Sequence, residues 1–266
     1  MVPSADVQKY IGHKVRQAER LRLLADRLRH EVNEHFQIDF KWDPSVLVVP
    51  NFGRVSAAEL ESRLDLKFNS PRRLAAIRHA RSVSGKLHQL ETLVEISAMI
   101  GWKGLTTEHY LTVGPWLLRG VEFRNGVIAT EDLVCIDEGK YAEQPQIHLV
   151  EGDIALTKDG TIGKAVVIPK LHNRIAAGST VARLRRRSTS TIDPYYLEYV
   201  IGHDFVQCQI ESFATGVAQP HITQEWIALL QIPRVSCEDL IARKWSEPPR
   251  DSWRLFGLSQ TATVAV

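Results

Sequence analysis

Two short segments, far apart in the sequence, carry the side chains best suited to bind a polyanion. The first covers residues 152–169 and holds Lys158, Asp159, Thr161 and Lys164 around glycines. The apolar runs on both sides of these residues predict a β-hairpin with a basic tip rich in hydrogen-bond donors. Its glycines and lysine are too closely spaced for a phosphate-binding loop. We expect the tip to face DNA, and a purely structural glycine turn is the alternative.

The second segment, residues 213–222, contains Gln219, Pro220 and His221 in a predicted turn. A glutamine amide offers one donor and one acceptor, which match the major-groove edge of adenine. Gln219 and His221 are therefore candidates for contacts with base edges. A turn with only a structural role explains the pair equally well.

A basic run follows the hairpin and extends the candidate surface. The whole chain carries a net charge of only +2, so any affinity for nucleic acid must come from local clustering of cations. Such a cluster can replace counterions along a phosphate backbone, and a solvated charged face is the alternative. Asp159 is the only acidic residue within this stretch, whose cations are Lys158, Lys164, Lys170, Arg174, Arg183, Arg185, Arg186 and Arg187. We assign Arg174, Arg183, Arg185 and Arg186 to the DNA-binding set.

Catalytic and metal-binding motifs are missing from the sequence. It has neither GxxxxGK[ST] nor HExxH, and its three cysteines have no zinc-ligand spacing, so we predict no catalytic residue, no metal site and no cofactor in this chain. The run Asp193-Pro194-Tyr195-Tyr196 is similar to the motif with which amino-methyltransferases hold a base. Its third residue differs, and no glycine-rich cofactor loop precedes it, so we predict a helix start with inward-facing tyrosines. The cysteine usage favours a reduced, cytoplasmic protein, and no run is long and apolar enough to cross a membrane.

A long amphipathic helix must precede this surface. Residues 1–36 have no internal proline after Pro3, and their apolar residues recur at alternating three- and four-residue steps. This spacing predicts a coiled-coil-like spacer or dimerisation helix that packs on one apolar partner, or an ordinary helix that packs on its own domain. The seam consists of Ile11, Ala18, Leu21, Ala25, Leu28 and Val32, and it is interrupted at Lys14.

The rest of the chain predicts an α+β protein with a β-rich domain and embedded helices. Breaker residues indicate a linker over residues 37–55, and the domain occupies residues 56–240. Within it we expect helices over residues 57–66 and 194–201, and short helical or mixed segments over 74–80 and around 87–96. We also expect a hairpin turn at Asn125-Gly126 and a closing strand over 226–232. The tail, residues 241–266, contains Pro248-Pro249 and is expected to be irregular.

These segments, in this order, resemble a specificity subunit of a type I restriction-modification system, in a form with a single target-recognition domain. The resemblance rests on residues 152–169, on Ala214-Thr215-Gly216 with Gln219-Pro220-His221-Ile222, on the strand that ends near Ile232-Pro233, and on the helical run 10–22. Arg63-Leu64-Asp65, with Phe68 and Pro71, is similar to the entry into that domain. The resemblance covers most of residues 1–240.

The resemblance implies a non-catalytic subunit that binds double-stranded DNA. It implies a partner modification subunit that binds S-adenosylmethionine and methylates adenine, and a restriction subunit that cuts. Such subunits hold two recognition domains separated by paired helices, whereas this chain has one domain and no evident second long helix. Two copies are therefore expected to dimerise through the seam, or the chain is a partial subunit. A stand-alone DNA-modifying enzyme and an interaction scaffold that does not bind DNA are the rival interpretations.

Overall fold

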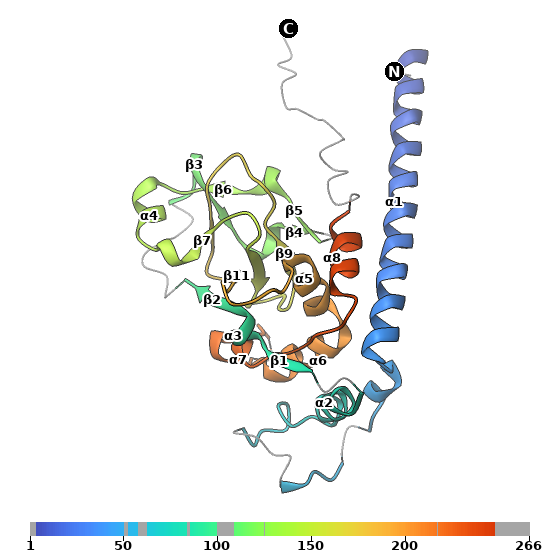
Figure 1. Cartoon of the computed structure of the whole chain (residues 1–266). Helices are drawn as coiled ribbons and strands as arrows, with labels where there is room; N and C mark the ends of the chain where they lie inside the picture. Colours follow the sequence, from blue (N-terminus) through green and yellow to red (C-terminus); the bar gives the residue numbers. More distant parts are fainter. Residues whose placement is uncertain are drawn as a thin grey trace.

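The computed structural model describes residues 4–50, 53–57, 63–83, 86–99, 109–124, 126–216 and 218–247. It is an α+β protein in which one long helix, α1, runs beside a β-rich body with embedded helices (Figure 1). This arrangement confirms the predicted fold class. Within these ranges no helix has both the length and the apolar character that a bilayer crossing requires.

Helix α1 spans Ala5–Phe40, and Lys41 ends it in the left-handed conformation with a φ of 54°. The predicted helix is thus confirmed, but its predicted end at residue 36 is wrong by four residues, and the linker begins correspondingly later. The reason is burial, because Phe36 and Phe40 both lie inside the body with no exposed surface. A short 3-10 helix, Pro44–Leu47, follows, and the Asp43 carboxylate caps it by accepting from the Ser45 backbone N–H at 2.9 Å.

An aromatic cluster joins the end of α1 to the body. The Phe36 ring lies 4.7 Å from the His203 ring and 5.3 Å from the Tyr199 ring, measured between centroids. The Phe40 ring lies 5.5 Å from the Phe205 ring in an edge-to-face arrangement. Aromatic pairs at these distances add to the free energy gained from burial alone. The last two turns of α1 therefore belong to the core of the body.

Two four-stranded sheets form the body. The first is antiparallel throughout, and the second contains one parallel pair, β3 with β10. In spatial order, the first consists of β2 (Val94–Ala98), β11 (Val181–Arg186), β8 (Ile154–Thr157) and β9 (Ala165–Val167); the second consists of β6 (Val134–Cys135), β3 (Leu111–Leu118), β10 (Ile175–Ala177) and β7 (His148–Leu149). All four residues of β8 are buried, which agrees with a strand at the centre of the core.

Two small antiparallel strand pairs complete the strands. Strand β1 (Leu87–Gln89) pairs with β12 (Gln231–Pro233), and β4 (Phe123–Arg124) pairs with β5 (Val127–Ile128). Gly126, between β4 and β5, has a φ of 78°, so the turn predicted at this position is confirmed. The predicted closing strand over 226–232 is wrong in its first half. That half is helical, because Thr223 caps a helix there by accepting from the Trp226 N–H.

Short helices cover the sheets. Two of the predicted helices are confirmed, namely α2 and α5, whereas residues 63–65 of the predicted helix 57–66 are not helical and residues 58–62 lie outside the described residues. The helices are α2 (Pro71–Val83), α3 (Leu90–Leu93), α4 (Glu138–Ala142), α5 (Pro194–Gly202), α6 (Asp204–Phe213) and α7 (Gln224–Ala228). The Asp65 carboxylate explains the turn before α2, since it accepts from the Phe68 N–H at 2.9 Å and pairs with Arg63. The Phe68 N–H lowers the pKa of Asp65.

A last helix, α8 (Glu238–Ser246), corrects the expectation of an irregular tail from residue 241 onward. It lies beside α1 (Figure 1), and the Lys244 ammonium pairs with Glu31 of α1 and lowers the pKa of that carboxyl to about 2. Asp39 of α1 accepts from the Cys237 N–H at 2.9 Å at the start of α8. Side chains distant in sequence therefore stabilise this helix. The double proline 248–249 lies outside the described residues.

Replacing Phe36 with alanine should lower the free energy of unfolding by about 3–5 kcal/mol, because the substitution leaves a cavity in the aromatic cluster. Leu23→Ala is the matched control on the same helix, since Leu23 is 71% exposed, and it should change stability by less than about 0.5 kcal/mol. Urea denaturation followed by circular dichroism measures both. Equal effects would show that α1 is not part of the cooperative core.

The stability of the body should fall as the pH drops from about 6.5 to about 4. Burial lowers the pKa of His203 to about 4, so the unfolded chain takes up this proton at a higher pH than the folded chain does. Protonation also removes the acceptor at Nδ1 that caps α6 through the Phe205 N–H at 3.2 Å. His203 should thus contribute roughly 2–3 kcal/mol above this window and lose it through the window.

The variant His203→Asn keeps a capping acceptor but cannot titrate. Urea midpoints measured between pH 4 and pH 7 should therefore vary less steeply for His203→Asn than for the wild type. The difference between the two slopes isolates His203 from the carboxylates that also titrate in this range. Parallel slopes would mean that His203 has an ordinary pKa in the folded chain.

Candidate nucleic-acid interface

The predicted hairpin is present, with β8 and β9 as its strands. Its neck is closed by the Thr157 side chain, whose oxygen accepts from the Lys164 N–H at 2.9 Å, and by a backbone bond from Gly163 N to Thr157 O at 2.9 Å. Gly160 and Gly163 have φ values of 72° and 83°, which other residues adopt only with strain. The tip is thus a defined loop held at both ends.

The second candidate segment lies directly against this tip. The Gly160 N–H donates to Pro220 O, and the Ile222 N–H donates to Lys158 O, both at 2.9 Å. A tight turn brings the segment there, and a Cβ at Gly216 would lie 2.4 Å from Gln219 O. The structure therefore joins two segments whose proximity the sequence suggested only through resemblance. We call them together the clasped tip, residues 158–164, 214–216 and 218–222.

Two side-chain contacts of Asp159 stabilise the clasped tip. The Asp159 carboxylate contacts His221 Nδ1 on one side and Lys158 Nζ, at 2.7 Å, on the other. An ionised carboxylate can only accept, so Nδ1 carries the proton and Nε2 remains available for another partner. The Lys158 side chain is only 12% exposed, whereas that of His221 is 40% exposed. The Asp159–His221 contact therefore links the two segments, Lys158 pairs with Asp159 within the hairpin, and His221 lies beside exposed Gln219.

Two arginines of the basic run lie inside the structure. Arg185 forms two hydrogen bonds with Asp153, from Nε at 2.8 Å and from Nη2 at 2.7 Å, and this contact raises its pKa. Arg183 is only 6% exposed and donates to His148 O and Ser97 Oγ, both at 3.3 Å, and burial lowers its pKa. Arg185 Nη2 also donates to His148 O at 3.2 Å, so both side chains contact the second sheet through His148 of β7.

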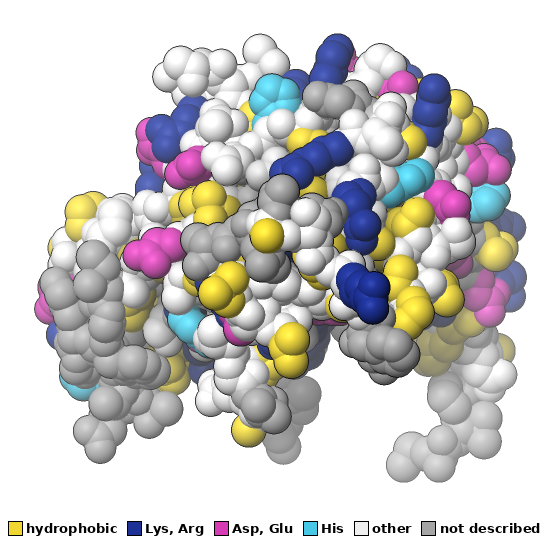
Figure 2. Space-filling model, turned by 90° about the horizontal axis from the view of Figure 1, so that it is seen from below, with side chains coloured by type: hydrophobic (Ala, Val, Ile, Leu, Met, Phe, Trp, Pro, Cys, Tyr) yellow, Lys and Arg dark blue, Asp and Glu magenta, His cyan; other side chains and the backbone are white. Residues whose placement is uncertain are grey.

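The remaining arginines are dispersed. Arg174, next to β10, pairs with Glu138 of α4 and stays charged, because this contact raises its pKa. Arg186 is exposed at the end of β11. The interpretation that Asp159 alone balances the basic run is thus wrong, because Asp153 and Glu138 come from outside it. On the face drawn in Figure 2, cationic side chains are likewise interspersed with apolar and acidic ones.

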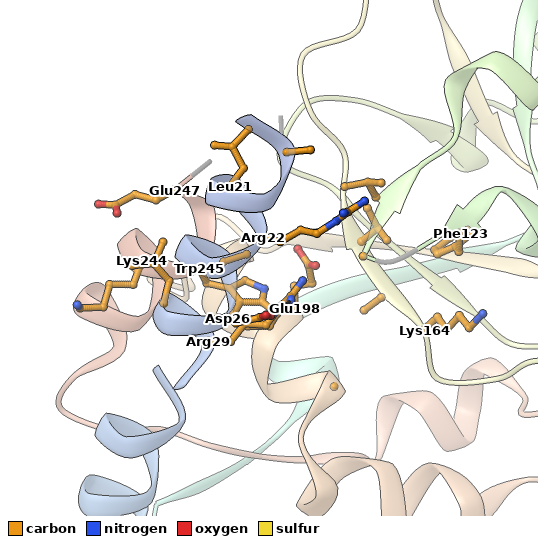
Figure 3. Close-up of a pocket in the computed structure, with 18 of the residues that line it drawn as sticks. Leu21, Arg22, Asp26, Arg29, Phe123, Lys164, Glu198, Lys244, Trp245 and Glu247 are labelled. Carbon is orange, nitrogen blue, oxygen red and sulfur yellow. Dashed lines mark hydrogen bonds and ion pairs between the residues drawn. The ribbon is translucent and has the colours of Figure 1, made fainter. Parts of the chain in front are cut away.

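A groove of about 1410 Å³ separates α1 from the other side of the hairpin tip. Thr161, Ile162 and Lys164 line it from the hairpin, and Phe123 and Val127 line it from the β4–β5 pair. In Figure 3 the Lys164 ammonium points away from α1, so only the stem of this side chain borders the groove. The buried Glu122 carboxylate fixes the groove wall by accepting from the Arg119 backbone N–H at 2.7 Å.

The predicted seam of α1 is divided between two environments. Val32, at the C-terminal end of the seam, is fully buried in the body. For this end, the alternative of an ordinary helix that packs on its own domain is correct. The upper part borders the groove, and Ile11 is still 49% exposed. Lys14, which interrupts the predicted seam, also lines the groove. Arg22 and Trp245 line it as well, and the sequence analysis did not identify them as candidate site residues. The groove residues from the seam are Ile11, Ala18, Leu21, Ala25 and Leu28.

The structure assigns structural roles to the residues that resembled a base-holding motif. Asp193 caps α5 by accepting from the Tyr195 N–H at 2.8 Å, with Pro194 in the first turn. Tyr196 is fully buried and donates to Pro233 O at 2.7 Å.

Burial also raises the pKa of the Cys208 thiol to about 12, so this thiol stays protonated. Among the described residues, no cluster of metal-ligating side chains is present.

No protein-family model matches the sequence, and no curated protein matches it. Solved structures do match. The type IIG restriction endonuclease BpuSI superposes with a TM-score of 0.51 at 9% identity, over 70% of this chain and 29% of BpuSI. The M. genitalium type I S subunit matches at a TM-score of 0.42 and 16% identity (59% of this chain, 36% of that one), and the HsdS subunit of Thermoanaerobacter tengcongensis at 0.44 and 14% (90% and 48%).

The chain spans less than half the length of each of these three proteins. At such low identity the matches concern the fold alone. The fold of this chain is similar to that of part of BpuSI, a restriction endonuclease. The predicted resemblance is confirmed at this level.

Removing the Arg185 side chain should destabilise the protein without a direct effect on any exposed surface. Arg185→Met leaves the Asp153 charge, which is 2% exposed, without its main partner, and should cost about 2–4 kcal/mol. Arg186→Met removes the same charge from the adjacent exposed position and should cost less than about 0.5 kcal/mol. Urea denaturation compares the two. Equal losses would place Arg185 among the surface arginines.

Proposed function

We propose that this chain recognises a DNA sequence as the specificity subunit of a type I restriction-modification system. The observation that carries the proposal is the clasped tip, in which Asp159 joins the hairpin to His221. It presents hydrogen-bonding side chains from two distant segments on one rigid support. The fold similarity to restriction enzymes supports the same conclusion. The resemblance of the sequence pointed to it independently.

The groups of the clasped tip divide by chemistry. Lys164 and Thr161 are exposed, and they provide a cation and a hydroxyl for phosphate oxygens. Gln219 can pair with the edge of an adenine, and His221 offers Nε2 to a neighbouring base. Lys158 and Asp159 act through His221 and are positioning residues. Arg183 and Arg185 support the sheets below, whereas Arg174 and Arg186 lie outside the clasped tip and can add phosphate contacts from the flank.

The subunit performs no catalysis of its own in this proposal. It directs a modification subunit, which binds S-adenosylmethionine, to an adenine within the recognised sequence, and a restriction subunit acts through the same complex. One recognition domain reads one half of a split site. The second half then requires another recognition domain, in a second copy or in a longer chain.

Co-expression with a candidate modification subunit, followed by mapping of methylated adenines, tests the proposal. The wild-type complex should methylate one defined sequence. The double variant Gln219→Ala/His221→Ala should bind a duplex with this sequence about 10–100-fold more weakly, because each pair of contacts to a base contributes about 1–3 kcal/mol. The control Gln37→Ala/His30→Ala removes the same residue types from exposed positions on α1 and should leave binding unchanged.

Rising salt separates this proposal from the rival interpretations. A DNA reader loses affinity with salt and keeps a sequence preference, whereas a scaffold that does not bind DNA shows neither. Methylation by the purified chain alone would support a stand-alone enzyme. A complex that methylates no defined sequence would contradict the proposal.

A further inference from the structure

One histidine of the clasped tip is held both by its backbone and by its ring. His221 exchanges two backbone hydrogen bonds with Thr215, at 2.8 Å and 2.9 Å, and the next residue, Ile222, donates to Lys158 O at 2.9 Å. The ring contacts Asp159 through Nδ1, yet the side chain is still 40% exposed. The imidazole is therefore positioned before a ligand arrives, and it remains accessible to one.

The two oxygens of the Asp159 carboxylate have different partners. Oδ1 contacts His221 Nδ1, and Oδ2 accepts from the Lys158 ammonium at 2.7 Å. An ammonium can only donate and a carboxylate can only accept, so the direction of both bonds is fixed. A neutral imidazole that donates from Nδ1 has no proton on its other nitrogen. Nε2 of His221 is therefore a hydrogen-bond acceptor.

Two other histidines of the chain show that the partner decides which ring nitrogen carries the proton. His203 Nδ1 accepts from the Phe205 N–H at 3.2 Å, which leaves the proton of the neutral ring on Nε2. His148 Nε2 lies 2.7 Å from the Tyr141 carbonyl oxygen, and a carbonyl only accepts, so this nitrogen is protonated as well. Of these three rings, only that of His221 donates from Nδ1.

An acceptor and a donor at this position select different bases. In the major groove, adenine and cytosine present amino groups at N6 and N4, whereas guanine and thymine present carbonyl oxygens at O6 and O4. Unprotonated Nε2 can accept from an amino group, and it has no proton to give to a carbonyl oxygen. Phosphate oxygens are also acceptors, so they do not suit this nitrogen either.

We propose that Asp159, held by Lys158, makes His221 select adenine or cytosine over guanine or thymine at one position of a DNA strand. His221 is the specificity-determining residue. Asp159 and Lys158 act through it and are positioning residues. The inference rests on the proposed function, because it gives the base class and the direction of a contact made by the clasped tip.

Nitrogen-15 NMR of the imidazole rings tests the tautomer without DNA. The full chain is measured at about pH 8, above the ordinary titration range of histidine. His221 should carry its proton on Nδ1, whereas His203 and His148 should carry theirs on Nε2. The signal lost in His221→Ala identifies the ring. A His221 ring protonated on Nε2, or on both nitrogens, would overturn the proposal.

Asp159→Asn should move the proton of His221 to Nε2. The asparagine oxygen must face the Lys158 ammonium, which can only donate, so the amide NH2 faces Nδ1 and turns it into an acceptor. Lys158→Met/Asp159→Asn removes this constraint, because the amide can then present either group to the ring. The two variants therefore separate the direction of the bond from its presence.

Sequencing of the duplexes that the full chain selects from a random pool, again at about pH 8, measures the base preference. His221→Ala should abolish the preference at one position, where the wild type should favour adenine or cytosine about tenfold. Asp159→Asn should reverse the preference there to guanine or thymine by a similar factor. Lys158→Met/Asp159→Asn should show neither preference, and the other positions should not change.

Glu138→Gln is the matched control, since it also converts a paired carboxylate into an amide, but at the Arg174 pair outside the clasped tip. It should leave the base preference at every position unchanged. Urea midpoints show whether each variant is folded. If Asp159→Asn does not fold, the wild-type tautomer and the base at the position identified by His221→Ala still decide.

Three outcomes of the selection would contradict the proposal. The first is a wild-type preference for guanine or thymine at the position that His221→Ala affects, and the second is a folded Asp159→Asn variant with the wild-type preference. The third is a wild-type chain that has the expected tautomer but selects no sequence. That result would contradict the proposed function itself, whereas the first two would leave DNA recognition intact.

Discussion

The packing of Phe36 and Phe40 into the body fixes the direction of α1, and the groove between α1 and the hairpin depends on it. Because the rings of these residues contact Tyr199, His203 and Phe205, the last two turns of α1 cannot rotate or slide without opening the core. The rest of the helix then extends rigidly past the body. Its apolar stripe is held at a set distance from the hairpin, and this separation is the groove.

Pairing of charges decides which cations of the chain can act on a polyanion. Asp153 and Glu138 neutralise Arg185 and Arg174, and such pairs contribute little to the potential at a distance. The cations that remain without a carboxylate partner among the described contacts include Lys164 at the clasped tip and Arg22 in the groove. Their positions, and not the small net charge, define the two candidate surfaces.

The hairpin tip connects these surfaces. One side of the tip is bound to the segment with His221, through Asp159 and the backbone of Gly160. The other side presents Thr161 and Ile162 to the groove.

Local patterns in the sequence determined the elements that depend on neighbours along the chain. The spacing of apolar residues predicted α1, the glycines predicted the hairpin, and Asp193-Pro194 predicted the start of α5. Only the tertiary structure decided what the charged side chains do. Arg183, Arg185 and Asp159 resembled surface residues because a sequence does not display Asp153, Ser97 or His221 opposite them. Burial and pairing between distant segments cannot be read from local composition, and they separated supporting residues from candidates for recognition.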